Sequence, residues 1–325
     1  MPSPSKKPRS WPGLKPESNI IHDAGKETFM KIQADCIPCI LTMTLKAVQN
    51  LSLTAKAEKD LLTEIMKIPG LRGLDWDQTS PAIIETVMTL ITNTVHDPDP
   101  FRREKIQVNA QALALLPFLE KMVDASAEPL YTAAKIAILG NSMDIMMPEG
   151  LSSLEKFIRE KLEAPLSREA FDPFCRQMPK ARQILYLTDN AGEIVFDRLF
   201  IQTLKKQYDV AVTVVVRSLP TLNDATLKEA MEAGLDQVAT LMENGIDGPF
   251  PGTRLKRCSP AVRGMARESD LIISKGGGNF DSLSEEVAGL ETPVFFMLLS
   301  KCRPLNAFFK TRLHQPVMAQ IRNSI

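Results

Sequence analysis

The C-terminal half of the sequence alternates short apolar runs, rich in β-branched residues, with stretches of helical periodicity. The apolar runs occupy residues 184–188, 210–216, 237–242, 270–274 and 293–299. The helical stretches between them cover 194–206, 224–233, 260–268 and 279–288. Strands that are buried on both faces and joined through helices are typical of a doubly wound, mainly parallel α/β sheet of the Rossmann-like type. We predict this fold class for residues 140–325.

The N-terminal half has a different pattern. From Asp35, a plausible helix N-cap, to about Leu139, apolar residues recur at helical spacing and strand signals are nearly absent. Further helices are predicted at 55–67, 80–95, 101–123 and 128–139. These patterns indicate an all-helical subdomain over 30–139. Residues 1–29 are rich in Pro, Ser and Lys without periodicity, which predicts a disordered extension.

Charge and cysteine content narrow the possible partners and compartment. Lys plus Arg equals Asp plus Glu at 39 each, so the net charge gives no reason to expect nucleic acid or an anionic membrane as a partner. No apolar run approaches the roughly 20 residues that a membrane helix needs. The 5 cysteines are scattered apart from one close pair, which favours reduced thiols over a disulfide framework. We expect a cytoplasmic protein.

Reactive side chains follow the predicted strands, where ligands bind in open parallel sheets. They are Thr188, Asp189, Asn190, Glu193, Arg217, Asn223, Asp224, Lys275 and Asn279. Among them, Asp189, Asn190 and Asp224 offer two carboxylates and an amide oxygen, a hard donor set suited to Mg²⁺ or Mn²⁺. The alternative for the same residues is a turn or a helix cap.

A glycine-rich segment, Lys275-Gly276-Gly277-Gly278-Asn279, ends a predicted strand and opens a helix. Glycines allow the backbone to approach an anion closely, and the amides at a helix start attract phosphate. Lys275 adds a positive charge for a phosphoryl oxygen. The segment matches neither the GxGxxG nor the P-loop pattern. It indicates either phosphate binding or a flexible turn between strand and helix.

Two further motifs precede the sheet. GNSMD at 140–144 contains Asn141 and Asp144 after a helix that Gly140 would end, so capping and function are both open. Cys36 and Cys39 form a CxxC at a helix N-terminus, where the helix dipole should lower thiol pKa. The pair supplies half of a zinc site that Cys258 or Cys302 would complete. A redox role and inert buried thiols are the alternatives.

Several motifs together resemble those of a known family. They are DCIPC at 35–39, DPDPFRREKIQVN at 97–109, GNSMD at 140–144, DNAGEIVFD at 189–197, PTLNDAT at 220–226 and KGGGNFDSL at 275–283. The chain resembles the damage-control phosphatase family, which includes proteins described as acidic-residue methyltransferases. Its CxxC is similar to that of the microbial-type branch. Gly277 stands where Gln is usual in the family and Asp281 where Glu is usual.

The resemblance implies a phosphatase with a divalent ion, Mg²⁺, Mn²⁺, Co²⁺ or Ni²⁺, held by Asp189, Asn190 and Asp224. It also implies that Lys275 and the nearby backbone contact phosphate. We assign to substrate and phosphate binding the polar and glycine residues around this centre: Asn141, Glu193, Arg217, Gly276, Gly277, Gly278 and Asn279.

The expected reaction is hydrolysis of a small phosphomonoester, either a sugar phosphate or a damaged phosphometabolite. The nucleophile is a metal-activated water or the carboxylate of Asp189. Two alternatives stay open. One is carboxyl methyl transfer from S-adenosylmethionine, which such a sheet can host. The other is a non-catalytic metal- or metabolite-binding protein whose CxxC is the sensor.

Overall fold

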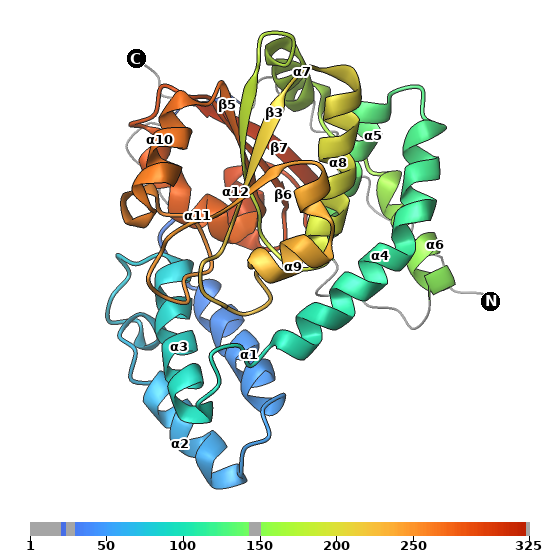
Figure 1. Cartoon of the computed structure of the whole chain (residues 1–325). Helices are drawn as coiled ribbons and strands as arrows, with labels where there is room; N and C mark the ends of the chain where they lie inside the picture. The colour runs from blue at the N-terminus through green and yellow to red at the C-terminus, as the bar shows by residue number, and fades with distance from the viewer. Residues whose placement is uncertain (1–20, 24–29, 143–150, 323–325) are drawn as a thin grey trace, which may run out of the picture.

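The computed structural model describes residues 21–23, 30–142 and 151–322, and a single sheet forms its centre (Figure 1). The strands are β1 (Ile21–Asp23), β2 (Gln183–Leu187), β3 (Ala211–Val216), β4 (Thr240–Glu243), β5 (Leu271–Lys275), β6 (Val294–Leu299) and β7 (Pro316–Arg322). Their order is β1-β7-β6-β5-β2-β3-β4, and β6 and β7 pair antiparallel while the other neighbours are parallel. The doubly wound, mainly parallel sheet predicted from the sequence is confirmed.

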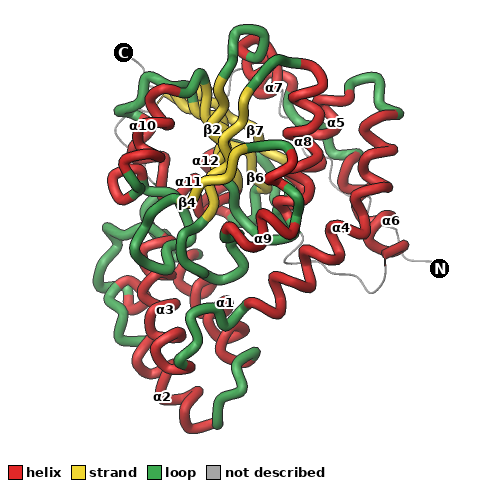
Figure 2. Tube along the Cα trace, in the orientation of Figure 1, coloured by secondary structure: helices red, strands yellow, loops and turns green. Residues whose placement is uncertain are grey.

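Helices cover both faces of this sheet (Figure 2). They are α1 (Cys36–Gln49), α2 (Ala55–Ile65), α3 (Ser80–Val95), α4 (Arg102–Asp124), α5 (Pro129–Gly140), α6 (Leu151–Leu162), α7 (Arg168–Gln177), α8 (Glu193–Gln207), α9 (Leu227–Glu232), α10 (Pro260–Glu268), α11 (Gly276–Val287) and α12 (Arg303–Phe308). Short 3₁₀ turns lie at Gly70–Arg72, Leu235–Gln237 and Leu255–Arg257.

The strands bury side chains on both faces, which explains their unbroken apolar runs. In β2, Ile184 and Tyr186 join the core formed with α5 and α8, whereas Leu185 and Leu187 join the core formed with α10 and α11. Successive side chains of a strand point to opposite faces, so an apolar residue is needed at every position. All residues of β5 and β6 are buried for the same reason.

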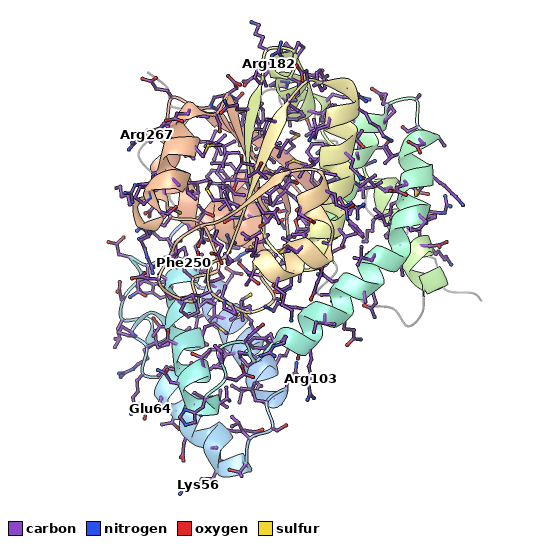
Figure 3. The ribbon with its side chains drawn as sticks, viewed as in Figure 1. Lys56, Glu64, Arg103, Arg182, Phe250 and Arg267 are labelled. Atoms are coloured by element: carbon purple, nitrogen blue, oxygen red, sulfur yellow. The ribbon has the colours of Figure 1, made fainter. Side chains whose placement is uncertain are left out.

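The helices α1 to α3 form a lobe with its own hydrophobic core, which runs from Ile32 to Phe101. Figure 1 shows this lobe in blue to cyan below the sheet, and Figure 3 places Lys56 and Glu64 at its remote end. Helix α4 leaves the lobe, and from Ala112 onward its apolar side chains belong to the core of the sheet, as do those of α5. The core therefore changes within α4, not at residue 139, because helical periodicity does not reveal which core a helix face meets.

Ion pairs also join the lobe to the sheet. The guanidinium of Arg257 donates two hydrogen bonds to the carboxylate of Glu85 in α3, at 2.8 and 2.7 Å. Asp35, at the start of α1, accepts a hydrogen bond of 2.7 Å from Arg303 of α12 and makes no side-chain cap bond. The lobe is thus held against the loops at one edge of the sheet.

Some elements differ from the sequence-based expectations. Ile21–Asp23 pairs with β7, so the predicted disordered extension contributes an edge strand, while the rest of 1–29 lies outside the described residues. Asp144 also lies outside them. The helices α6, α7 and α12 and the strand β7 were not predicted. Among the described helices, none is long and apolar enough to cross a membrane.

Candidate active site

The predicted site residues meet where the strand order reverses. The chain passes from β2 to β3 and β4 on one side and returns to β5 on the other side of β2. Leu187 at the end of β2 is in register with Val215 and Ser274. The residues that follow β2, β3 and β5 therefore share one edge, which is where doubly wound sheets bind ligands.

Backbone pairing holds the loops after β2 and β3 together. Asn190 and Asp224 form an isolated antiparallel bridge. The amide of Ala225 donates to the carbonyl of Asp189, and the amide of Ala191 donates to that of Asn223, both at 2.8 Å. This pairing brings Asp189, Asn190 and Asp224 to one place. None of the three caps a helix, because Gly192 is the N-cap of α8 and Thr226 that of α9.

A cavity of about 300 Å³ opens from these loops toward the lobe. Six of the residues predicted to bind metal or phosphate line it: Asn141, Asp189, Asn190, Asp224, Gly277 and Gly278. Other predicted residues are buried behind its wall as supports: Glu193, Arg217, Lys275, Gly276 and Asn279. The site therefore has residues that line the cavity and can contact a ligand, and buried residues behind them that hold the lining residues in place.

Arg217 is the cationic support of the two aspartates. Its Nε donates to Oδ2 of Asp224 at 2.6 Å, and its Nη2 lies 3.4 Å from Oδ1 of Asp189. Its Nη1 donates to Oδ1 of Asn279 at 3.1 Å and to Oγ1 of Thr253 at 3.3 Å. The guanidinium is fully engaged by protein groups and is 2% exposed. It orients the aspartates and does not reach the cavity, contrary to its assignment to substrate binding.

Lys275 is likewise internal. Its Nζ donates to the carbonyl of Ala137 at 3.0 Å, to Oε1 of Glu193 at 2.6 Å and to Oδ1 of Asp197. Burial opposes the charged ammonium, but Asp197 and Glu193 outweigh it, so the pKa of Lys275 is raised. The ammonium has no exposed surface. The expected contact between Lys275 and phosphate is therefore absent from this arrangement, in which Lys275 neutralises buried carboxylates.

Asn141 links the helical half of the chain to the aspartates. Its Nδ2 donates to Oδ2 of Asp189 at 3.0 Å and to Oε2 of Glu193 at 2.7 Å. The amide of Asn190 reaches Oδ2 of Asp189 at 3.1 Å. Burial raises the pKa of Asp189 well above its usual range, with Asp224 and Glu193 adding to the effect and Arg217 opposing it.

Gly276 fits the site because it has no side chain. A Cβ at this position would lie 1.9 Å from Oδ2 of Asp189, and the residue adopts a left-handed φ of +78°. Gly278 is also confined, because a Cβ there would lie 2.5 Å from the carbonyl oxygen of Pro251. At Gly277 a Cβ would meet only Leu305, at 3.7 Å. Two of the three glycines are therefore required by close approach.

The donor set fits a divalent cation. Two aspartate carboxylates and the amide of Asn190 converge at the end of the cavity, and the single guanidinium of Arg217 is shared between the two carboxylates. In the described part of the chain, no three His, Cys, Asp or Glu side chains are arranged to hold a metal. A cation here depends on the amide of Asn190 as its third protein ligand. Oxygen donors of this kind match Mg²⁺ and Mn²⁺.

The CxxC thiols lie on the wall of the same cavity. Cys36 and Cys39 are in the first turn of α1, and Cys302 faces the cavity at the start of α12. Burial raises the pKa of Cys39, with a further contribution from Cys36, so the expected lowering by the helix dipole is wrong for this thiol. Cys258 lies in the core instead, where burial raises its pKa to about 12. The described thiols do not form a metal-binding group.

Sequence reasoning did not assign three residues that matter here. Lys301 follows β6 and lines the cavity, and its position after a strand was the available signal. Asp197 lies one helical turn after Glu193 in α8, so the spacing alone places both on one face. Asn109 accepts a 2.6 Å hydrogen bond from the amide of Gly192 and donates to the carbonyl of Glu229 at 3.2 Å. Asn109 thus ties α4 to the loop of Asp189, which no local pattern indicates.

Several known proteins are similar to this chain in sequence. The uncharacterized protein MJ0202 of Methanocaldococcus jannaschii is 30% identical over 281 residues, covering 85% of this chain and 91% of that protein. Damage-control phosphatase PH1575 of Pyrococcus horikoshii is 28% identical over 280 residues, covering 84% and 92%. A damage-control phosphatase of Archaeoglobus fulgidus is 29% identical over 283 residues, covering 85% and 94%.

The fold is also that of a solved relative. The crystal structure of a DUF89 family protein from Pyrococcus horikoshii superposes with a TM-score of 0.80 at 22% identity, covering 90% of this chain and 100% of that one. The family model of the damage-control phosphatase ARMT1-like domain matches residues 32–315, which include the lobe, the strands β2 to β6 and the candidate site. The chain belongs to the damage-control phosphatase ARMT1-like family.

Proposed function

We propose that the protein hydrolyses small phosphomonoesters with the help of a divalent metal ion, Mg²⁺, Mn²⁺, Co²⁺ or Ni²⁺. The observation that carries this proposal is the convergence of Asp189, Asn190 and Asp224 at the end of a cavity on the ligand-binding edge of the sheet. Membership of the family supports phosphatase-type chemistry at the family level.

Each group at the cavity has a task in this proposal. Asp189, Asn190 and Asp224 hold the ion, which when bound supplies positive charge against the phosphoryl oxygens. The backbone amides of Gly277 and Gly278, in the first turn of α11, point their partial positive charge at an anion. Lys301 is the only described lysine or arginine on the cavity wall and adds a full charge.

The groups behind the wall keep the reacting groups in position. Arg217 fixes both aspartates, and Lys275 with Glu193 fixes the amide of Asn141. Positioned groups need no rearrangement while charge moves to the leaving oxygen. In the reaction a water oxygen bonds to phosphorus, the ester P–O bond breaks, and the alcohol leaves with a proton from that water. The attack is direct or passes through a phosphoryl ester on the Asp189 carboxylate.

The test is hydrolysis of p-nitrophenyl phosphate by metal-stripped protein resupplied with each of the four ions. We expect activity that returns with metal and falls by a factor of about 10² or more in Asp189→Ala and Asp224→Ala. Asp236→Ala, an exposed aspartate remote from the cavity, is the matched control and keeps full activity. Activity that is absent with every ion, or unaffected by both site substitutions, would contradict the proposal. Those results would favour methyl transfer or a binding role.

Two isotope measurements and a trapping experiment together separate the routes of attack. Single turnover in ¹⁸O-water places the label in phosphate after one cycle if water attacks directly. If Asp189 is the nucleophile and water attacks the acyl phosphate at its carboxyl carbon, enzyme labelled in its carboxylate oxygens passes one of them to phosphate, and phosphate from the first turnover carries no solvent label. If water attacks the acyl phosphate at phosphorus, solvent label enters phosphate as in direct attack. Acid-quench trapping of a phosphoryl-enzyme on Asp189 then decides between them.

A further inference from the structure

The cavity has two unlike walls. The wall at the sheet edge is polar and carries Asp189, Asn190, Asp224 and Lys301. The facing wall comes from α1 and α3 and is mainly apolar, with Ile40, Met43, Pro81 and Ile84 and the thiols of the CxxC. A ligand that fills this space meets charge at one end and hydrocarbon at the other.

The apolar wall is supported by the core of the lobe, on which Leu222 of the loop after β3 also packs. Ile40 is 3% exposed and belongs to the core of the lobe, whereas Met43 and Ile84 pack on that core and stay half-buried. Their free surfaces face the cavity. Leu305 of α12 continues the apolar surface on the other side. These side chains are held in place without a ligand, so the wall is preformed.

The apolar wall offers few partners to hydroxyl groups. Its described polar residues are Ser80, at the first turn of α3, and Asp35, whose carboxylate is engaged by Arg303. A hydroxyl that leaves water without a new hydrogen bond costs about 1–3 kcal/mol in proteins. A sugar with several hydroxyl groups therefore loses more here than a hydrocarbon group, which gains by burial.

We propose that the preferred substrates are phosphomonoesters of apolar alcohols, with the phosphate at the sheet edge and an alkyl or aryl group against α1 and α3. This inference rests on the proposed function, and it specifies the class of the alcohol. The volume of about 300 Å³ is at the lower limit for small-molecule pockets, which suits a short chain or a single ring.

The first test compares kcat/KM for ethyl, butyl and hexyl phosphate and for a hexose 6-phosphate, with Mn²⁺ present. We expect an increase of up to about fourfold for each methylene that the cavity buries. Hexyl phosphate should exceed the hexose phosphate by about tenfold or more, because the two have similar length and differ in hydroxyl groups. A hexose phosphate that equals or exceeds hexyl phosphate, or a flat response to chain length, overturns the proposal.

Binding of ethyl-, butyl- and hexylphosphonate, measured by calorimetry, gives a readout that needs no turnover. Affinity should rise with chain length, together with a more negative heat-capacity change. Absence of all hydrolysis with length-dependent binding would overturn the proposed phosphatase function and keep the apolar site. Hydrolysis together with binding that does not depend on chain length would keep the phosphatase function and overturn the apolar site.

Two variants locate the hydrocarbon. Met43→Gln keeps the length of the side chain but places an amide in the wall, and Ile84→Thr places a hydroxyl in the wall from α3. Each should lower the hexyl-to-ethyl ratio of phosphonate affinities several-fold. Met66→Gln, an exposed methionine of the lobe that does not line the cavity, is the matched control and leaves the ratio unchanged. If both wall variants leave the hexyl-to-ethyl ratio unchanged, the alkyl group does not lie against α1 and α3.

Discussion

Asn190 and Asp224 face each other across an isolated backbone bridge that joins the loops after β2 and β3. Main-chain hydrogen bonds of 2.8 Å on each side of this bridge fix the spacing of the loops. The scaffold of the site is therefore built from backbone, and its side chains can be changed with limited effect on the loops themselves.

The crowded carboxylates should reduce the stability of the metal-free protein. Burial, with Asp224 and Glu193 nearby, raises the pKa of Asp189, which means that its charge is disfavoured in the folded state. Asp189→Asn removes that charge and keeps the shape, so we expect a higher Tm without metal together with loss of activity. Differential scanning calorimetry in chelator measures the shift. A lower Tm in the variant would show that the crowded carboxylates do not destabilise the metal-free protein.

Gly276 and Gly277 offer a matched pair of substitutions. Gly276→Ala introduces a Cβ that collides with Asp189 at a left-handed φ, so we expect a loss of about 1–3 kcal/mol in the free energy of unfolding and a strong loss of activity. Gly277→Ala has room and a right-handed backbone, and its stability should change by less than about 1 kcal/mol. Urea unfolding of both variants checks the contrast, and equal losses would refute it.

The buried network of Lys275, Glu193 and Asp197 should behave as a unit. Lys275→Met leaves two carboxylates buried without their cation, which costs about 3–5 kcal/mol of stability. Asp197→Asn in the same chain removes one of those charges and should recover part of the loss. A double-mutant cycle from urea unfolding gives the coupling. Strict additivity would mean that Lys275 and Asp197 do not interact in solution.

Asp281 should make stability depend on pH. Burial raises the pKa of its carboxyl from 3.8 to about 8, and its Oδ1 has no hydrogen-bond partner among the described residues. Between pH 4 and 8 the folded state therefore binds more protons than the unfolded state, so stability falls as pH rises. Asp281→Asn should remove this fall, which is on the order of 1 kcal/mol per pH unit. Urea unfolding at pH 5 and pH 8 measures the fall in the free energy of unfolding for both proteins. An equal fall in both would show that Asp281 is not its cause.

Lys301 should contribute to anion binding in the cavity. Lys301→Gln removes the charge, and we expect the inhibition constant of inorganic phosphate and the KM of p-nitrophenyl phosphate to rise by about tenfold. The effect should shrink at high salt, because a partly exposed charge is screened. Lys256→Gln, at an exposed site outside the cavity, is the control. If both variants bind phosphate alike, Lys301 has no such role.

The strand ends could be predicted because they follow from local pattern. Unbroken apolar runs marked the central strands, and the edge rule then selected Asp189, Asn190 and Asp224 without any coordinates. The direction of Lys275 could not be predicted in this way. Lys275 is the last residue of β5, and its side chain turns inward to Asp197. Such a direction depends on burial between elements that lie far apart in sequence.

Elements at the margins were harder to predict. The segment of β1 has three residues and gains its structure only by pairing with β7 at the opposite end of the chain. α7 contains Pro173, which obscures a helical pattern, and β7 begins with Pro316. Asn109 acts through contacts with Gly192 and Glu229, which lie far away in sequence, so its role could not be predicted from local periodicity.

The separate core of the lobe has a consequence for how such a protein can change over evolution. Met43 and Ile84 pack on the core of the lobe, so substitutions there act on a core that is distinct from the two cores of the sheet. Selection can therefore alter the alcohol that is accepted while the hydrolytic machinery stays constant. A chain organised in this way can acquire new substrates by drift in one lobe alone.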